Sequence, residues 1–215
     1  MLTLNSAAMD EMVKKAMQKW PNVPNVFGWL RLDRRGNWLL QVRPDSFERI
    51  GNTALVEFIG RNYERDDSGR WYFQNGPQRV FVGLDYTPHV YRLGEKAGEG
   101  ERQWVTHAGW PAGRPLEMLF DEDDNVVLVT ELGPGVVEDR DLSALIDGLR
   151  ENGMEVDLDE LLPRLRAGGG KPLSGLRLFG EPVSVAVINS DAVERRFKFV
   201  AEPAPETGRG QVQPQ

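Results

Sequence analysis

Two histidines and two short acidic runs are the residues whose types could support acid–base or metal chemistry. His89 lies in DYTPHVYRL and His107 in WVTHAGW. A metal site built on two histidines would also need a carboxylate ligand, and no spacing in the sequence selects one. Asp66 and Asp67 belong to DDSG, a composition that is typical of a turn. Spacing alone therefore defines no catalytic constellation here.

The acidic run FDEDDN, Asp121–Asp124 with its flanking residues, invites comparison with a calcium-binding loop. Asp121, Asp123 and Asn125 have the spacing of the first three ligands of an EF-hand. Val126, however, occupies the position at which that loop requires glycine, and Leu132 the position of its bidentate glutamate. We interpret the run as a solvated hairpin turn, and we expect no metal and no cofactor.

Binding chemistry is better represented than catalysis. The hexapeptide QNGPQR, residues 74–79, lies between the apolar runs WYF and VFVGL, and a turn there needs only its glycine and proline. Arginines bind carboxylates and phosphates in a planar, bidentate manner, and aromatic rings commonly line ligand pockets. The candidate ligand-binding residues are Gln74, Asn75, Gln78, Arg79, Arg31, Arg61 and Trp71, and Arg92 could join the same anion clamp.

Composition narrows the function classes further. The chain has 215 residues, with 26 Lys and Arg against 33 Asp and Glu, for a net charge of −7. This charge disfavours general nucleic-acid binding. There are no cysteines, which excludes disulfides and thiolate chemistry, and no apolar run is long enough to span a bilayer. We therefore expect a soluble cytoplasmic protein without a nucleic-acid or membrane partner.

The elements that must position these residues begin with an N-terminal helix. Apolar residues recur at helical spacing from Met9 to Trp20, Ser6 or Asp10 could cap the helix, and Pro21 would stop it. Since the helix could begin directly after Met9, both Met1 and Met9 are candidate start residues.

Hairpins and a second helix follow. FGWLRLDRRGNWLLQV predicts a β-hairpin that turns at Asp33–Asn37, with Gly36 supplying the unusual backbone angle. A helix capped by Asn52 or Thr53 is expected next, with Leu55, Phe58 and Ile59 on one face. RWYF and RVFVGL are then expected to be strands on either side of the QNGPQ turn.

An internal repeat is the most informative pattern in the chain. LDRRGNWLL (32–40) corresponds to FDEDDNVVL (120–128), LVEFI (55–59) to LSALI (142–146), and GRWYFQNGPQRVFV to GLRLFGEPVSVAV (175–187). The order hairpin, helix, hairpin thus occurs twice, and chance similarity of short patterns is the alternative explanation. The second copy carries an insertion with an expected extra helix around Leu158–Leu165.

These patterns predict an α+β fold of two tandem, internally duplicated halves built from antiparallel β-hairpins plus a helix. The expected divisions are an N-terminal helix (1–23) that docks on the first half, a first half (24–93), a linker (94–103), a second half (104–201) and a disordered C-terminal tail (202–215).

The motifs LDRRGNW, LVEFIGRNY, DDSGRWYFQNGPQRVFV and DYTPHV resemble the bacterial family known as domain of unknown function 1285, over residues 27–93. The segment MDEMVKKAMQKWPNVPNVFGWL is similar to the start of a closer group of uncharacterised proteobacterial proteins. The resemblance implies a duplicated α+β core, a C-terminal half like pleckstrin-homology folds, and a ligand cleft between the halves in a signalling role. It implies no enzyme. QNGPQR replaces the TP-E motif of that family, and the second-half insertion is a further departure.

The leading hypothesis is a non-catalytic, cytoplasmic binding or regulatory protein with a small anionic or nucleotide-like ligand between its halves. The alternative is a protein–protein interaction module that acts through a sheet edge or the tail. A metal-assisted hydrolase using Asp66, Asp67 or the Asp121–Asp124 run has the least support. The sequence leaves the ligand's identity and the oligomeric state open.

Overall fold

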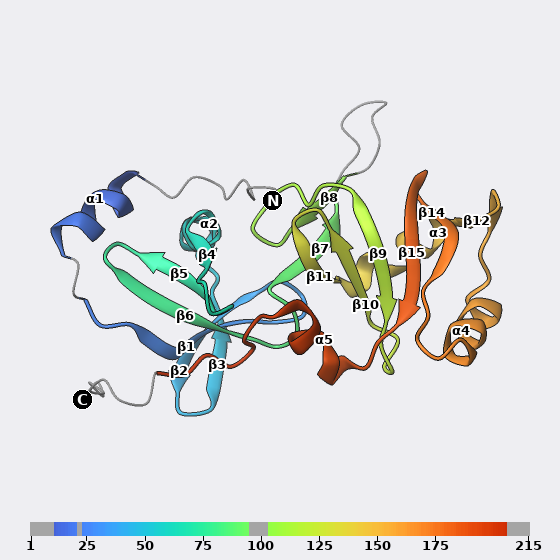
Figure 1. Cartoon of the computed structure of the whole chain (residues 1–215). Helices are drawn as coiled ribbons and strands as arrows, with labels where there is room; N and C mark the ends of the chain where they lie inside the picture. Colours follow the sequence, from blue (N-terminus) through green and yellow to red (C-terminus); the bar gives the residue numbers. More distant parts are fainter. Residues whose placement is uncertain (1–10, 21–22, 95–102, 206–215) are drawn as a thin grey trace. The chain divides into compact units, whose positions relative to one another are not determined.

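The computed structural model describes residues 11–20, 23–94 and 103–205, which form two β-sheets and five α-helices (Figure 1). The chain divides into two compact units. The first comprises the residues up to Asp33, then Asn37–Pro88 and the chain from Lys198 onward, and the second comprises Arg34–Gly36 and His89–Phe197. The α+β fold class is confirmed.

The first unit contains a six-stranded sheet with the order β3-β2-β1-β6-β5-β4. Its strands are β1 (Val26–Leu32), β2 (Trp38–Arg43), β3 (Ser46–Arg49), β4 (Tyr63–Arg65), β5 (Trp71–Asn75) and β6 (Gln78–Leu84). The central strands β1 and β6 are parallel, and the other neighbours are antiparallel. The unit also contains helices α1 (Glu11–Lys19) and α2 (Thr53–Arg61).

The second unit contains a nine-stranded sheet with the order β13-β12-β14-β15-β9-β10-β11-β7-β8. Its strands are β7 (His89–Leu93), β8 (Trp104–Thr106), β9 (Pro115–Phe120), β10 (Val126–Thr130), β11 (Gly133–Val137), β12 (Leu149–Glu151), β13 (Met154–Glu155), β14 (Leu173–Leu178) and β15 (Glu181–Val187). Its helices are the 3-10 turn η1 (Asp139–Asp141), α3 (Leu142–Asp147), α4 (Leu158–Ala167) and α5 (Ser190–Phe197). The extra helix expected in the insertion is confirmed as α4.

Sheet topology confirms the internal duplication. The first sheet runs β3-β2-β1-β6-β5-β4, and the second contains β11-β10-β9-β15-β14-β12 in the corresponding order. In each copy the first and last long strands, β1 with β6 and β9 with β15, are parallel, and the remaining neighbours are antiparallel. A helix, α2 or α3, follows the third strand of each copy. The second sheet is larger because β13 extends one edge, and β7 and β8 extend the other.

The first turn of each copy uses the same hydrogen bonds. In the first copy the Asp33 carboxylate accepts from the Asn37 backbone N–H at 2.8 Å and from its side-chain amide at 2.8 Å. In the second copy the Asp121 carboxylate accepts the equivalent bonds from Asn125, at 2.8 Å from each donor. Aspartate and asparagine side chains commonly hold turns in this way. The acidic run is therefore the hairpin turn that the sequence predicts.

Side chains from α2 and its neighbours fill the first unit's core on one face of the sheet. Tyr63 packs edge-on against Trp38 at a ring-centroid distance of 5.1 Å, and Phe58 of α2 packs against Phe73 at 5.4 Å. Asn52 caps α2, because its side chain accepts a hydrogen bond from the Leu55 backbone N–H at 3.1 Å. The predicted helix and its cap are confirmed.

Three details differ from the expectations. Met12 and Trp20 of the N-terminal segment are 80% and 51% exposed, so the buried side of α1 is reduced to Val13 and its half-buried neighbours. β3 has no counterpart among the expected strands, because its short sequence SFER has little apolar alternation. Gln74 is a buried strand residue and not part of a polar loop, since the β5–β6 turn contains only residues 76–77.

Several predictions fall wholly or partly outside the described residues. These are the caps Ser6 and Asp10, most of the expected linker (residues 95–102) and most of the expected tail (residues 206–215). The predicted first half, 24–93, also includes β7, which is hydrogen-bonded to β8 and β11 in the second sheet. In the part of the chain that the structure describes, no helix has both the length and the apolar character needed to cross a bilayer.

Candidate functional site

The β5–β6 hairpin distributes the predicted binding residues over two faces of the first sheet. Gln74 and Arg79 are directly opposite each other in the strand register, so their side chains share one face. Asn75 and Gln78 form the next pair and therefore point to the other face, which Trp71 also occupies by strand alternation. The sheet thus brings Gln74 and Arg79 together on one face and places Asn75, Gln78 and Trp71 on the opposite face.

Arg79 lies on an aromatic surface. Its guanidinium carbon is 4.5 Å from the centre of the Tyr72 ring, a geometry typical of a cation–π contact. The Tyr72 hydroxyl donates to Glu64 at 3.0 Å, and the Phe81 ring lies 5.7 Å from the Tyr72 ring. No carboxylate among the described residues forms an ion pair with Arg79. The guanidinium is therefore held in place by a ring and keeps donors available for another group.

Tyr72 remains protonated in this setting. Its burial, followed by the nearby Glu64 carboxylate, raises the pKa of the phenol to about 12, although the Arg79 charge acts in the opposite direction. The ring is consequently a neutral platform for Arg79 throughout the physiological pH range.

Gln74 supplies an unusual polar group beside Arg79. The residue is 1% exposed, and its Nε2 donates to the Gly76 carbonyl at 2.9 Å. Its Oε1 is buried and accepts no hydrogen bond from the described residues. Buried acceptors in folded proteins are nearly always satisfied, because an unmet one costs about 1–3 kcal/mol. An unused buried acceptor therefore lies next to an arginine that has no carboxylate partner.

The remaining predicted binding residues form structural contacts or lie on the other face of the sheet. Arg31 shares the face of Arg79, but its guanidinium donates to Asp85 at 2.7 Å and to Glu202 at 2.5 Å. Gln78 donates to the Pro24 carbonyl at 3.1 Å, which ties β6 to the chain before β1. Arg61 ends α2, and α2 packs on the opposite face through Phe58 and Phe73. These three do not join Gln74 and Arg79.

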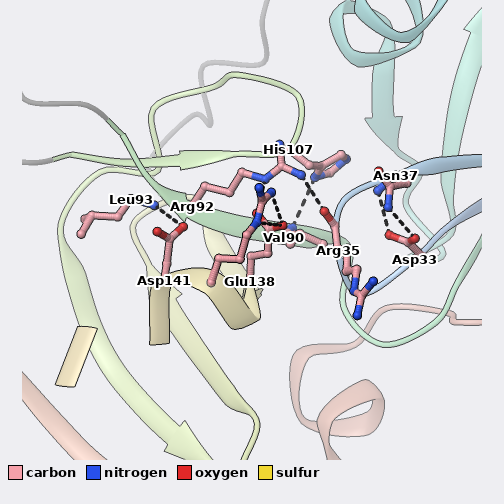
Figure 2. A network of polar contacts seen from close by, with 10 residues as sticks. Asp33, Arg35, Asn37, Val90, Arg92, Leu93, His107, Glu138 and Asp141 are labelled. Carbon is pink, nitrogen blue, oxygen red and sulfur yellow. Dashed lines mark hydrogen bonds and ion pairs between the residues drawn. The ribbon is translucent and has the colours of Figure 1, made fainter. Parts of the chain in front are cut away.

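A second polar cluster, in the second unit, centres on the buried carboxylate of Glu138 (Figure 2). Arg92 contacts one carboxylate oxygen through Nε at 2.7 Å, and Arg140 contacts the other through Nη2 at 2.5 Å. Arg92 also donates to the Arg35 carbonyl at 2.6 Å. Arg92 is therefore committed to a structural network that holds the turn residues Arg34–Gly36 within this unit.

Both histidines belong to the same region. Their ring centroids are 6.4 Å apart, and His107 Nδ1 accepts a hydrogen bond from the Val90 N–H at 3.3 Å. Burial lowers the pKa of His89 to about 3. Burial, followed by the charges of His89 and Arg92, lowers the pKa of His107 well below its usual value. Both imidazole rings are therefore neutral at pH 7, and neutral rings can pack in a buried environment.

Two of the carboxylates considered for metal chemistry, Asp66 and Asp121, hold turns. Asp66 accepts from the backbone N–H groups of Ser68 and Arg70 at 3.0 and 2.9 Å, and from Arg70 Nε at 2.8 Å. Asp121 has the corresponding role in its own turn. Across residues 11–20, 23–94 and 103–205, no group of three or more His, Asp or Glu side chains is placed to hold a metal ion.

Sequence reasoning did not single out Tyr72 or Glu138. Tyr72 looks like one more alternating strand aromatic, and the only signal for its role is its cross-strand position beside Arg79. Glu138 follows the apolar strand GPGVV, so its burial could have been suspected from position, although its two arginine partners could not.

Comparisons with known proteins point to uncharacterised families. The family described as "Protein of unknown function (DUF2946)" matches residues 9–204. A DUF1285 family protein from Silicibacter pomeroyi DSS-3 is similar in structure, with 16% identity, a TM-score of 0.49 and coverage of 85% of this chain and 93% of that chain. A DUF1285 family protein from Shewanella baltica OS155 shows 14% identity, a TM-score of 0.39 and coverage of 61% and 95%. No curated protein matches the chain. The expectation of a family of uncharacterised proteins is confirmed by the family match over residues 9–204.

Proposed function

The chain belongs to the family described as "Protein of unknown function (DUF2946)", and from its own residues we propose a non-catalytic, cytoplasmic binding or regulatory protein that takes a small anionic, nucleotide-like ligand. The site is the Gln74–Arg79 face of the first sheet. One observation carries the proposal: Arg79 is fixed on the Tyr72 ring without a carboxylate partner among the described residues.

The chemistry of this pair suits a phosphate or carboxylate that carries a hydrogen-bond donor. The Arg79 guanidinium presents planar donors that match two anionic oxygens, and stacking on Tyr72 reduces the conformational freedom lost on binding. Gln74 Oε1 is the adjacent acceptor for a ligand N–H or O–H, and a ligand reaches it once the side chains that bury it move aside. A nucleotide combines both features.

Thermal unfolding tests this proposal. The wild-type protein is heated with inorganic phosphate, sugar phosphates, or nucleoside mono-, di- and triphosphates. A ligand present at 100 times its dissociation constant adds about 2.7 kcal/mol of stability, or roughly 5–10 °C for a chain of this size. We expect such a shift from at least one nucleotide and its loss in Arg79→Ala.

Arg43→Ala is the matched control, because Arg43 is an exposed arginine in β2 of the same sheet. The Arg43→Ala protein should retain the rise in unfolding temperature that the ligand causes. Equal shifts in the Arg79→Ala and Arg43→Ala proteins would exclude the Arg79 face as the site. The absence of a shift across the whole panel would reject the proposed ligand class.

A protein-interaction module is the second candidate. Leu40 and Val42 of β2 are 42% and 45% exposed and point to the same face by strand alternation. Neighbouring exposed apolar residues are typical of protein-binding surfaces. If Leu40→Ser abolishes association with a cellular partner while nucleotides never shift the unfolding temperature, this second function replaces the first.

A further inference from the structure

The second unit contains a hollow at the end of its sheet where β14 turns into β15 and β9 begins. Its volume is about 330 Å³, within the range of small-molecule sites. Trp104, Pro115, Leu178 and Phe179 contribute to its apolar lining. Because β14–β15 corresponds to β5–β6 in the repeat, this hairpin is the counterpart of the one that carries Gln74 and Arg79.

Phe179 occupies a conformation that large side chains rarely adopt. Its φ is +49°, in the left-handed region, and such residues persist only where their surroundings hold them. Gly148 provides the space: a Cβ there would lie 2.4 Å from the Phe179 ring. The Trp104 ring also packs near Phe179, with a distance of 6.3 Å between the two ring centroids. The fold thus keeps an aromatic side chain at the hollow although a turn would favour glycine or asparagine.

The charged lining has an excess of carboxylate. Among the described residues that line the hollow, the charges are Arg114, Glu131 and Glu181. Arg114 is committed to Glu131, since its Nε and Nη2 donate to the Glu131 carboxylate at 3.0 and 2.9 Å. Its backbone N–H donates to the same carboxylate at 3.3 Å. Glu181 forms no ion pair with any residue that the structure describes and feels the Arg114 charge only at longer range, so the lining carries one more carboxylate than guanidinium.

We propose that this hollow binds a small organic cation with an aromatic or apolar body, its charge facing Glu181 and its body packed on Trp104 and Phe179. A cation is attracted both by the faces of aromatic rings and by the carboxylate. An anion, in contrast, would have to displace Glu131 from Arg114. This site lies within the second unit and does not depend on the Arg79 face.

A charge series with one aromatic body tests the proposal. The probes are phenethylammonium, neutral 2-phenylethanol and anionic phenylacetate, titrated into the full chain while the indole N–H resonance of Trp104 is followed by NMR. Trp104→Phe assigns that resonance. We expect phenethylammonium to bind about two- to fivefold more tightly than 2-phenylethanol, the size typical of an exposed charge or cation–π contact, and phenylacetate to bind most weakly.

Two variants and one control connect the preference to the hollow. Glu181→Gln should remove the preference for the cation. Phe179→Asn should weaken all aromatic probes without backbone strain, because asparagine tolerates positive φ. Glu155→Gln, at an 88% exposed glutamate in β13, should change nothing. Equal binding of cation and neutral probe, a preference for phenylacetate, or no perturbation of Trp104 would each overturn the proposal. So would a preference for the cation that persists in Glu181→Gln.

Discussion

Gly36 provides a quantitative test of packing in the second unit. It lies in the first hairpin turn with φ +77°, and a Cβ built on it would lie 2.7 Å from His107 Cβ. Gly36→Ala therefore combines two costs. Placing alanine at positive φ costs about 1 kcal/mol, and forcing a methyl group into this contact costs about 1–3 kcal/mol more. The expected loss of unfolding free energy is about 2–4 kcal/mol.

Gly153 separates the two costs, because its φ is +83° and a Cβ there would meet nothing within 4 Å. Gly153→Ala should lose only the backbone part, about 1 kcal/mol. The assay is urea unfolding of both variants and the wild type, with the slopes compared to verify that the unfolded states match. If Gly36→Ala and Gly153→Ala lose the same free energy of unfolding, the close contact between Gly36 and His107 is refuted.

Three further outcomes follow from burial and hydrogen bonding. The pKa of His89 is about 3 in the folded state, below its unfolded value of 6.5. Protonation of the unfolded state therefore lowers the free energy of unfolding as the pH falls from 6.5 toward 3, whereas above pH 6.5 this loss is absent. Urea unfolding should show that His89 accounts for about 2 kcal/mol of the stability lost between pH 6.5 and 5. His89→Gln should therefore lose less stability than the wild type over this range, while the part due to His107 persists; an unchanged pH dependence in that variant would contradict the assignment. Asp33→Ala and Asp121→Ala should each destabilise by about 1–2 kcal/mol, since both hold the same turn, and a large inequality in their unfolding free energies would oppose equivalent roles. Tyr72→Phe should lose about 1 kcal/mol with the hydrogen bond to Glu64 yet keep nucleotide binding in calorimetry, whereas a lost affinity would mean that the hydroxyl contacts the ligand.

The sequence was most informative where local chemistry decides structure. The turn at Asp33–Asn37 could be predicted because aspartate, glycine and asparagine have direct roles in turns. The Asn52 cap and helix α4 were likewise visible as local patterns. The repeat could be recognised because both copies must conserve the same apolar alternation and turn residues to form the same strand order.

The candidate site was only partly predictable, because its geometry depends on strand register. The hexapeptide identified Gln74 and Arg79, but a polar sequence does not show that β5 and β6 extend to Asn75 and Gln78. Extension of the strands buries Gln74 and sends Asn75 to the opposite face. Arg31 could not be recognised as an ion-paired residue, since its partner Glu202 lies 171 positions away in the chain.

The aromatic hollow depends on tertiary packing that local sequence patterns do not specify. Phe179 sits in a turn position that normally favours glycine or asparagine, and its location depends on Gly148 in a different element. Trp104 reaches the same hollow from β8, at the far edge of the sheet order. The sequence could suggest an aromatic binding surface, but not which of its six tryptophans would line it.

Anion binding by Arg79 is tested most directly by observing its side chain while a ligand is added. The Nε–H resonance of Arg79 can be assigned by comparison with Arg79→Lys and followed by NMR during titration with a nucleoside diphosphate and, separately, with the uncharged nucleoside. We expect a saturable shift of this resonance with the diphosphate and little change with the nucleoside, because the guanidinium binds the anionic oxygens. A diphosphate that binds without moving the Arg79 resonance, or an equal response to both compounds, would contradict anion binding by Arg79.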